Sequence, residues 1–96
     1  MKVNWSAQAG RDADNLWLYI AADNPDAADR VVIRIHEALA MLSEHPKAGR
    51  RGRIGKTREF VVAGTPYLVV YDVTPDEIEV RRVIHGAQDW PPKRKR

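Results

Sequence analysis

The 96-residue chain contains no cysteine. A disulfide framework and a thiolate metal site are therefore excluded. No apolar run approaches the ~20 residues that a membrane-spanning helix needs, and no charged start followed by an apolar run resembles a signal peptide. Disorder is also excluded, because 44% of the residues are hydrophobic. We expect one soluble, cytoplasmic domain over residues 1–96.

Basic residues are scarce in the first half of the chain and outnumber the acidic ones in the second. Residues 1–46 hold 4 Lys/Arg and 7 Asp/Glu, whereas residues 47–96 hold 12 and 6, so the halves carry net charges of −3 and +6. A basic surface of this kind raises the local concentration of polyanions or acidic protein surfaces. The imbalance therefore predicts a negatively charged partner.

Two amphipathic helices are expected in the first half, after a short strand over residues 2–5. Apolar residues recur at helical spacing over residues 7–22 and again over 25–44, and Ser6 and Asn24 are suited to cap the two helices. Because only a few residues separate these segments, they should form an antiparallel hairpin.

The second half predicts strands. Pro46 ends the helical region, residues 47–57 have the composition of a loop, and strands are expected over 58–63, 67–73 and 77–85. Short turns between these strands require antiparallel neighbours. The prediction is an α+β fold of order β-α-α-β-β-β, with the helical hairpin on one face of a small antiparallel sheet. Residues 91–96 should form a basic flexible tail, which Trp90 could staple to the domain.

A basic loop stands out as a candidate binding site. Six positive charges fall within twelve residues, namely Lys47, Arg50, Arg51, Arg53, Lys56 and Arg58. One interpretation is a strip that binds phosphates or an acidic partner. The other is a solvated loop whose arginines pair with carboxylates of the helices.

The last expected strand carries Arg81, Arg82 and His85. Strict alternation would place Arg82 on the face of Ile78, Val80 and Ile84, and Arg81 on the opposite face with Val83 and His85. An internal ion pair explains a charge among apolar neighbours. The acids nearest in sequence are Glu59, Asp72 and Asp89.

Catalytic chemistry has few candidates. His85 could act as a general acid or base, with Arg82 or Arg58 stabilising charge. No second histidine or carboxylate stands at metal-ligand spacing, so neither a metal nor a cofactor is expected.

Taken in order, several segments resemble the RelE/ParE superfamily of bacterial type II toxins. The resemblance covers nearly the whole chain, and its most specific parts are Asn24-Pro25, His45-Pro46, Thr57–Val62, Thr65–Tyr71 and Val83–Pro91. It implies the β-α-α-β-β-β fold and a toxin neutralised by a cognate antitoxin, through an acidic C-terminal segment of the antitoxin and in a heterotetramer or larger complex.

The superfamily divides by target. RelE-like members cut messenger RNA on the ribosome, and ParE-like members inhibit DNA gyrase. The central strand of RelE-like nucleases carries an arginine where Leu68 stands here, and such a charge would stabilise the scissile phosphate. We therefore expect a ParE-like toxin that acts by binding gyrase, with a metal-independent RelE-like endonuclease as the alternative. The residues expected to bind antitoxin or target are Arg50, Arg51, Arg53, Lys56, Arg58, Arg81 and Arg82.

Overall fold

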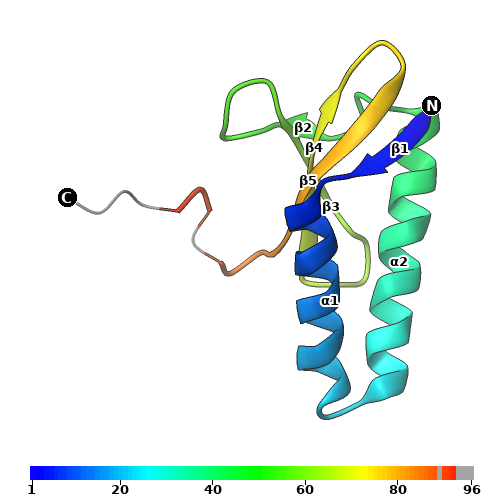
Figure 1. Cartoon of the computed structure of the whole chain (residues 1–96), viewed down its shortest axis with the longest axis vertical. Coiled ribbons are helices and arrows are strands. Elements are labelled where there is room, and N and C mark those ends of the chain that lie inside the picture. The colour runs from blue at the N-terminus through cyan, green and yellow to red at the C-terminus, as the bar shows by residue number, and fades with distance from the viewer. Residues whose placement is uncertain (89, 93–96) are drawn as a thin grey trace.

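The computed structural model describes residues 1–88 and 90–92. Its elements follow the predicted order with one additional short strand (Figure 1). They are β1 (Lys2–Trp5), α1 (Ala7–Ala21), α2 (Pro25–Glu44), β2 (Arg50–Arg51), β3 (Arg58–Val61), β4 (Tyr67–Val73) and β5 (Glu77–His85). None of the helices in these residues has the length and apolar character needed to cross a membrane. Most of the predicted basic tail, residues 93–96, lies outside the described residues.

Local capping sets the starts of both helices. The Ser6 hydroxyl accepts a hydrogen bond from the Ala9 amide (3.0 Å), and the Asn24 side chain accepts one from the Ala27 amide (3.1 Å). Side-chain oxygens at these positions satisfy amides that have no partner within the helix. Because Pro25 needs no such partner, it begins α2 without loss.

The sheet has the strand order β1-β5-β4-β3-β2. The pairs β5–β4, β4–β3 and β3–β2 are antiparallel, but β1 runs parallel to β5. The expectation of a wholly antiparallel sheet is therefore wrong at this edge. A short turn dictates the relative direction only of strands that follow one another in the sequence. Two helices and three strands lie between β1 and β5 in the chain, so no short turn connects these two strands. The expected α+β class and the helical hairpin on one face are confirmed.

The segment 47–57 is only partly a loop. Within it, Arg50 and Arg51 form strand β2, which pairs with Glu59 and Arg58 of β3. Two residues are too few to produce a periodic signal, which is why the sequence pattern missed this strand.

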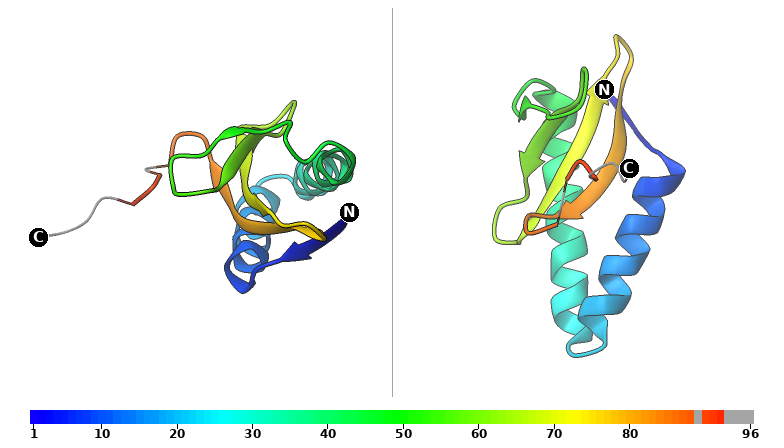
Figure 2. Two further views of the ribbon diagram at one scale, coloured as in Figure 1. Left: turned by 90° about the horizontal axis from the view of Figure 1, so that it is seen from above. Right: turned by 90° about the vertical axis from the view of Figure 1, so that its left-hand side faces the viewer.

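The helices cover one face of the sheet (Figure 2). The core lies between these layers and contains residues from α1, α2, β4 and β5. Fully buried members include Ala9, Ile35, Leu42, Val69, Tyr71, Ile78 and Val80. A second, smaller cluster, described below, lies on the opposite face, which no helix covers.

Candidate functional site

The uncovered face of the sheet, which we call the open face, holds a small apolar cluster. Leu68 and Val70 of β4 and Ile84 of β5 are buried there, and Trp90 packs on them. The expectation that Trp90 staples the end of the chain to the domain is confirmed. The Arg82 guanidinium lies 5.3 Å from the centre of the Trp90 ring, close enough for a cation–π contact.

A β-bulge changes the faces of the last strand. Val70 pairs with Arg82 and Tyr71 with Val80, so Arg81 is the extra residue. Before the bulge Val80 faces the helices, whereas after it Val83 does. Arg82 therefore shares the open face with Val70 and Ile84, and its expected place beside Ile84 is confirmed. Its expected place beside Ile78 and Val80 is wrong, because these two face the helices, and so is the expected placement of Arg81 on the opposite face.

Arg82 is held in an ion pair with α1. Its Nε lies 2.7 Å from Oδ2 of Asp12, which also accepts a hydrogen bond from the Val83 amide at 3.0 Å. The side chains are 22% and 9% exposed. The expected internal ion pair is present, but its partner is none of the three acids near it in sequence. The pair ties α1 to β5 beside Trp90.

Arg81 is also paired. Its Nη1 lies 2.8 Å from Glu79 and 3.2 Å from Asp72, and its side chain is half exposed. Both carboxylates are themselves partly exposed. Such a pair contributes little to stability, so Arg81 remains available to exchange these partners for another carboxylate.

A hollow of about 460 Å³ lies on the open face beside Trp90. Its lining combines apolar, cationic and polar groups: Ser6, Gln8, Ile54, Thr57, Val70, Glu79, Arg81, Arg82 and Trp90. The Trp90 Nε1–H is buried and has no hydrogen-bond acceptor among the described residues. An unsatisfied buried donor costs free energy, so the indole is held here by its apolar and cation–π contacts rather than by a hydrogen bond.

The basic loop is pinned by a buried carboxylate. Glu59 is 1% exposed and accepts hydrogen bonds from Arg50 Nη2 (3.1 Å) and the Arg53 amide (3.0 Å), with Arg53 Nη2 at 3.2 Å. Burial raises the pKa of Glu59, but these donors and positive charges outweigh it, so the pKa lies below its usual value. The alternative interpretation, in which arginines of the loop pair with carboxylates of the helices, is wrong for Arg50 and Arg53, because their partner is a residue of β3.

Arg58 holds the start of the same loop. Its Nη1 donates to the carbonyl oxygens of Gly49 (2.8 Å) and Lys47 (3.3 Å). Beneath it the buried Tyr71 hydroxyl donates to the Pro46 carbonyl (2.7 Å) and accepts from the Gly49 amide (2.9 Å). A side chain at Gly49 would have its Cβ 2.5 Å from that hydroxyl. The loop is thus anchored at both ends.

His85 is placed poorly for proton abstraction. Its Nδ1 accepts a hydrogen bond from the Ala87 amide at 3.0 Å, and its ring packs edge-on against Tyr67. The neutral tautomer that this bond selects carries its proton on Nε2. In this tautomer the Nε2–H can donate a hydrogen bond, and the Nδ1 lone pair that would accept a proton is already engaged by the Ala87 amide.

The three candidate catalytic residues do not meet at one point: Arg82 and His85 line a common hollow of about 630 Å³, but Arg58 does not. In the strand register, Arg58 lies opposite Tyr71, which faces the helices, whereas Arg82 lies opposite Val70 on the open face. His85 lies opposite Tyr67, the first residue of β4. Within residues 1–88 and 90–92, no three His, Asp or Glu side chains lie close enough together to share a metal ion.

The sequence analysis did not identify Asp12 as the partner of Arg82 or the Tyr71 hydroxyl as an anchor of the loop. It considered Glu59 as a partner of Arg82, whereas Glu59 binds Arg50 and Arg53. Asp12 stands three residues after Ala9 and four before Leu16, so it interrupts an apolar helical stripe, and a carboxylate there needs a cation. Tyr71 stands in an apolar run, where its hydroxyl requires a partner. These signals were present, but neither identifies the partner.

The fold thus defines a small α+β protein with one uncovered sheet face, on which cations and an aromatic side chain surround a hollow. The model of the ParE toxin family of type II toxin–antitoxin systems, parDE, matches residues 3–90. Y4kP of Sinorhizobium fredii, a candidate toxin by its name, is 44% identical over 90 residues, covering 94% of this chain and 93% of Y4kP. Toxin RelE2 of Caulobacter vibrioides is 32% identical over 87 residues, which cover 91% of this chain and 97% of RelE2.

A solved structure, from the chromosomal ParDE system of P. aeruginosa, has the same fold, with a TM-score of 0.76 over 88% of this chain and 95% of that one, at 24% identity. The chain belongs to the ParE family of type II toxins, within the RelE/ParE superfamily. The resemblance expected from its sequence is confirmed. Membership implies an antitoxin as its protein partner.

Proposed function

We propose that this toxin acts in the cytoplasm by binding and inhibiting DNA gyrase, without catalysis, and that a cognate antitoxin neutralises it. The proposal rests on the state of the candidate residues: Arg58 lies apart from His85 and Arg82, and the Arg82 guanidinium is held by Asp12. Cleavage of RNA through its 2′-hydroxyl needs a base and a charge stabiliser at one phosphate. Here the histidine has its acceptor nitrogen occupied, and the two arginines lie on opposite faces of the sheet.

Leu68 supports the same conclusion. It is 5% exposed, pairs with Ile84 and belongs to the apolar cluster of the open face. In RelE-like nucleases, to which the chain was compared above, the corresponding residue is an arginine. An apolar side chain at this point cannot stabilise a charged phosphate, so this face is suited to contact rather than to cleavage.

The open face is the proposed antitoxin-binding surface. An acidic segment could replace the carboxylates that Arg81 now contacts, because both are partly exposed. Arg50 and Arg53 border the same face at 58% and 46% side-chain exposure. Such a segment would fold as it binds. We propose that the complex is a heterotetramer or larger.

The test of the target uses purified toxin with gyrase and relaxed plasmid, and in parallel with ribosomes translating a defined message. We expect loss of supercoiling and an intact message. Message cut in phase with codons, while gyrase remains active, would refute the proposal.

A ribosome-dependent, metal-independent endonuclease is the second candidate, because a relative bears the name RelE2. It requires that His85→Ala abolish growth arrest while antitoxin binding survives. Arg82→Ala is less decisive, since it also breaks the ion pair with Asp12. Growth arrest that is undiminished in His85→Ala would exclude this candidate.

A further inference from the structure

The cations of the second half fall into two groups. Arg50, Arg53, Arg81 and Arg82 each form an ion pair with a carboxylate. Lys47, Arg51, Lys56 and Arg58 form none within the described residues. The last three gather at the corner where β2 meets β3, which we call the basic corner. The basic loop of the sequence therefore contains two groups of cations in the structure: those paired with a carboxylate and those without such a partner.

The strand pairing at the basic corner sets like charges side by side. In the β2–β3 ladder, Arg50 faces Glu59, a matched pair, and Arg51 faces Arg58. Directly opposed residues of an antiparallel pair lie within about 5.5 Å at their Cα atoms, and like charges there are destabilising. An anion between the two guanidinium groups would relieve that repulsion.

The corner also holds a hollow of about 200 Å³, lined by Arg51, Gly55, Lys56, Thr57 and Arg58. No carboxylate lines it, whereas the three hollows that involve β5 each include one: Glu79, Asp12 or Asp72. Its lining also lacks any large apolar or aromatic side chain. The hollow therefore suits a compact anion and offers nothing to hold the side chain of a peptide or a stacked base.

The backbone around the hollow is held in place. The Gly52 amide donates to the Thr57 carbonyl at 2.7 Å, and the Thr57 amide and hydroxyl both donate to the Ile54 carbonyl. Arg58 is fixed through Nη1 alone, so its Nε and Nη2 make no hydrogen bond within the described part of the chain. These two donors suit a bidentate contact with phosphate.

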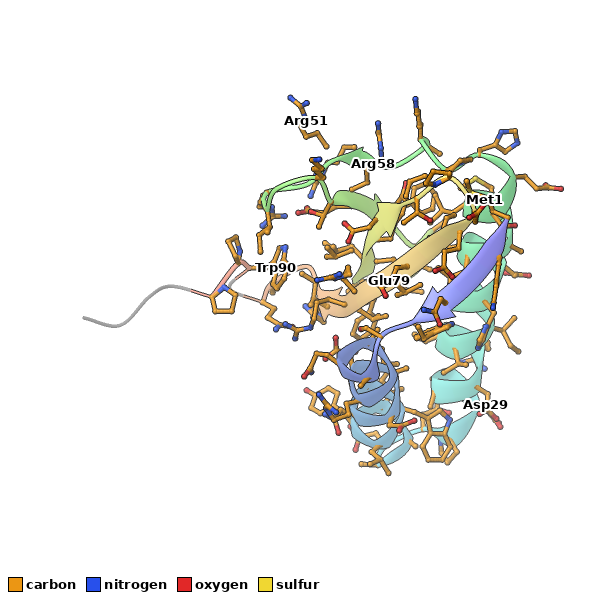
Figure 3. All side chains as sticks on the ribbon, turned by 45° about the horizontal axis from the view of Figure 1, so that its top comes forward. Met1, Asp29, Arg51, Arg58, Glu79 and Trp90 are labelled. Atoms are coloured by element: carbon orange, nitrogen blue, oxygen red, sulfur yellow. The ribbon has the colours of Figure 1, made fainter. Side chains whose placement is uncertain are left out.

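The two arginines of the basic corner lie apart from the open face. In the strand pairing, Arg58 lies opposite Tyr71, which faces the helices, whereas Glu59, Arg50 and the hollow beside Trp90 belong to the open face. Figure 3 shows Arg51 and Arg58 projecting from the same edge of the molecule, away from Trp90. Lys56 lies nearer to the open face, because it also lines a hollow with Asp72 and Arg81. A partner that covers the open face would leave Arg51 and Arg58 accessible.

We propose that the basic corner binds phosphodiester groups of a nucleic acid backbone, through Arg51, Lys56 and the free donors of Arg58. The contact would be independent of base sequence, because the lining has no group that reads or stacks on a base. It is a binding site in addition to the gyrase and antitoxin contacts proposed above, and it does not depend on them.

The test is fluorescence anisotropy with the full chain and a fluorescein-labelled 20-base-pair duplex over a range of salt concentrations. The test variant is Arg51→Gln/Lys56→Gln. Arg30→Gln/Arg34→Gln is the matched control, because it removes the same charge from exposed arginines that also line a hollow without a carboxylate. Far-UV circular dichroism checks that both variants remain folded.

Each lost phosphate contact lowers the slope of log K against log salt by about 0.9, so the test variant should lose about 1.8 and bind at least about tenfold more weakly at 50 mM salt. The control should lose far less. Equal losses in both variants would show that only net charge matters and would overturn the proposal.

Two further probes separate the sources of the anion. A single-stranded RNA of the same length shows whether the contact distinguishes RNA from DNA. A glutamate-rich peptide of equal charge tests the protein alternative. If the test variant loses peptide binding while DNA and RNA binding are unchanged, the corner is a carboxylate site and the proposal is wrong.

Discussion

Replacing Glu59 by glutamine tests whether a buried carboxylate holds the basic loop. Glutamine keeps the size of the side chain and one oxygen for the Arg53 amide, but it removes the charge that Arg50 and Arg53 share. Loss of the ion pairs between Glu59 and these two arginines should make β2 and the residues that follow it more mobile. The fold itself should survive, since the main core lies on the other face of the sheet.

The expected cost follows from the exposure of the partners. A hydrogen bond to a charged group contributes about 1.5–3 kcal/mol when buried, but exposed ion pairs contribute only about 0.2–1 kcal/mol. Both arginines are half exposed and can return to water. We therefore expect a loss of about 1–2 kcal/mol in the free energy of unfolding, a fall in Tm of roughly 5–10 °C for a domain of this size.

The pH dependence gives an independent check. The pKa of Glu59 is lowered in the folded state, so its contribution is fully present above the unfolded pKa of about 4.3 and is lost as pH falls through the folded value. The difference in Tm between wild type and Glu59→Gln should therefore be large at pH 7 and shrink below about pH 4.

Thermal unfolding followed by circular dichroism measures both effects. Glu37→Gln makes the same chemical change on the exposed face of α2 and should alter the free energy of unfolding by less than about 0.5 kcal/mol. A fall in Tm of less than about 2 °C in Glu59→Gln, or a Tm difference from wild type that does not change with pH, would refute a stabilising role for the Glu59 carboxylate.

Three other substitutions test separate parts of the structure by the same unfolding assay. Tyr71→Phe removes both hydrogen bonds that hold the start of the loop and should cost about 2 kcal/mol; a cost below about 0.5 kcal/mol would mean that water replaces the hydroxyl. Asp12→Asn should cost about 1–2 kcal/mol, because Arg82 loses its charged partner, and an unchanged Tm would contradict the pair. Arg51→Glu should stabilise the chain by about 0.2–1 kcal/mol, since it would face Arg58 with an opposite charge, and a destabilised variant would argue against repulsion at the basic corner.

The fold was largely predictable because its signals are local. Ser6 and Asn24 cap the helices within three residues of themselves, and the apolar stripes that follow lie within single elements. The turns between β3, β4 and β5 are short enough to dictate antiparallel pairing. The direction of β1 was not predictable in this way, since nothing near it in sequence specifies its partner.

The site was less predictable because its contacts are not local. Arg82 pairs with a residue 70 positions away, and no spacing in the sequence connects them. The faces of Arg81 and Arg82 depend on a β-bulge opposite Val70 and Tyr71, a feature of the strand pairing that alternation along one strand cannot show. Charge counting found the basic loop, but only the structure separates the cations held by Glu59 from those of the basic corner.

The central claim is that this toxin acts by binding gyrase rather than by cutting RNA. The most direct measurement titrates wild type and His85→Ala, side by side, into a gyrase supercoiling reaction and into a translating ribosome reaction with a labelled message. We expect both proteins to inhibit supercoiling at the same concentration and to leave the message intact. Cleavage of the message by wild type, lost in His85→Ala and accompanied by full gyrase activity, would contradict it.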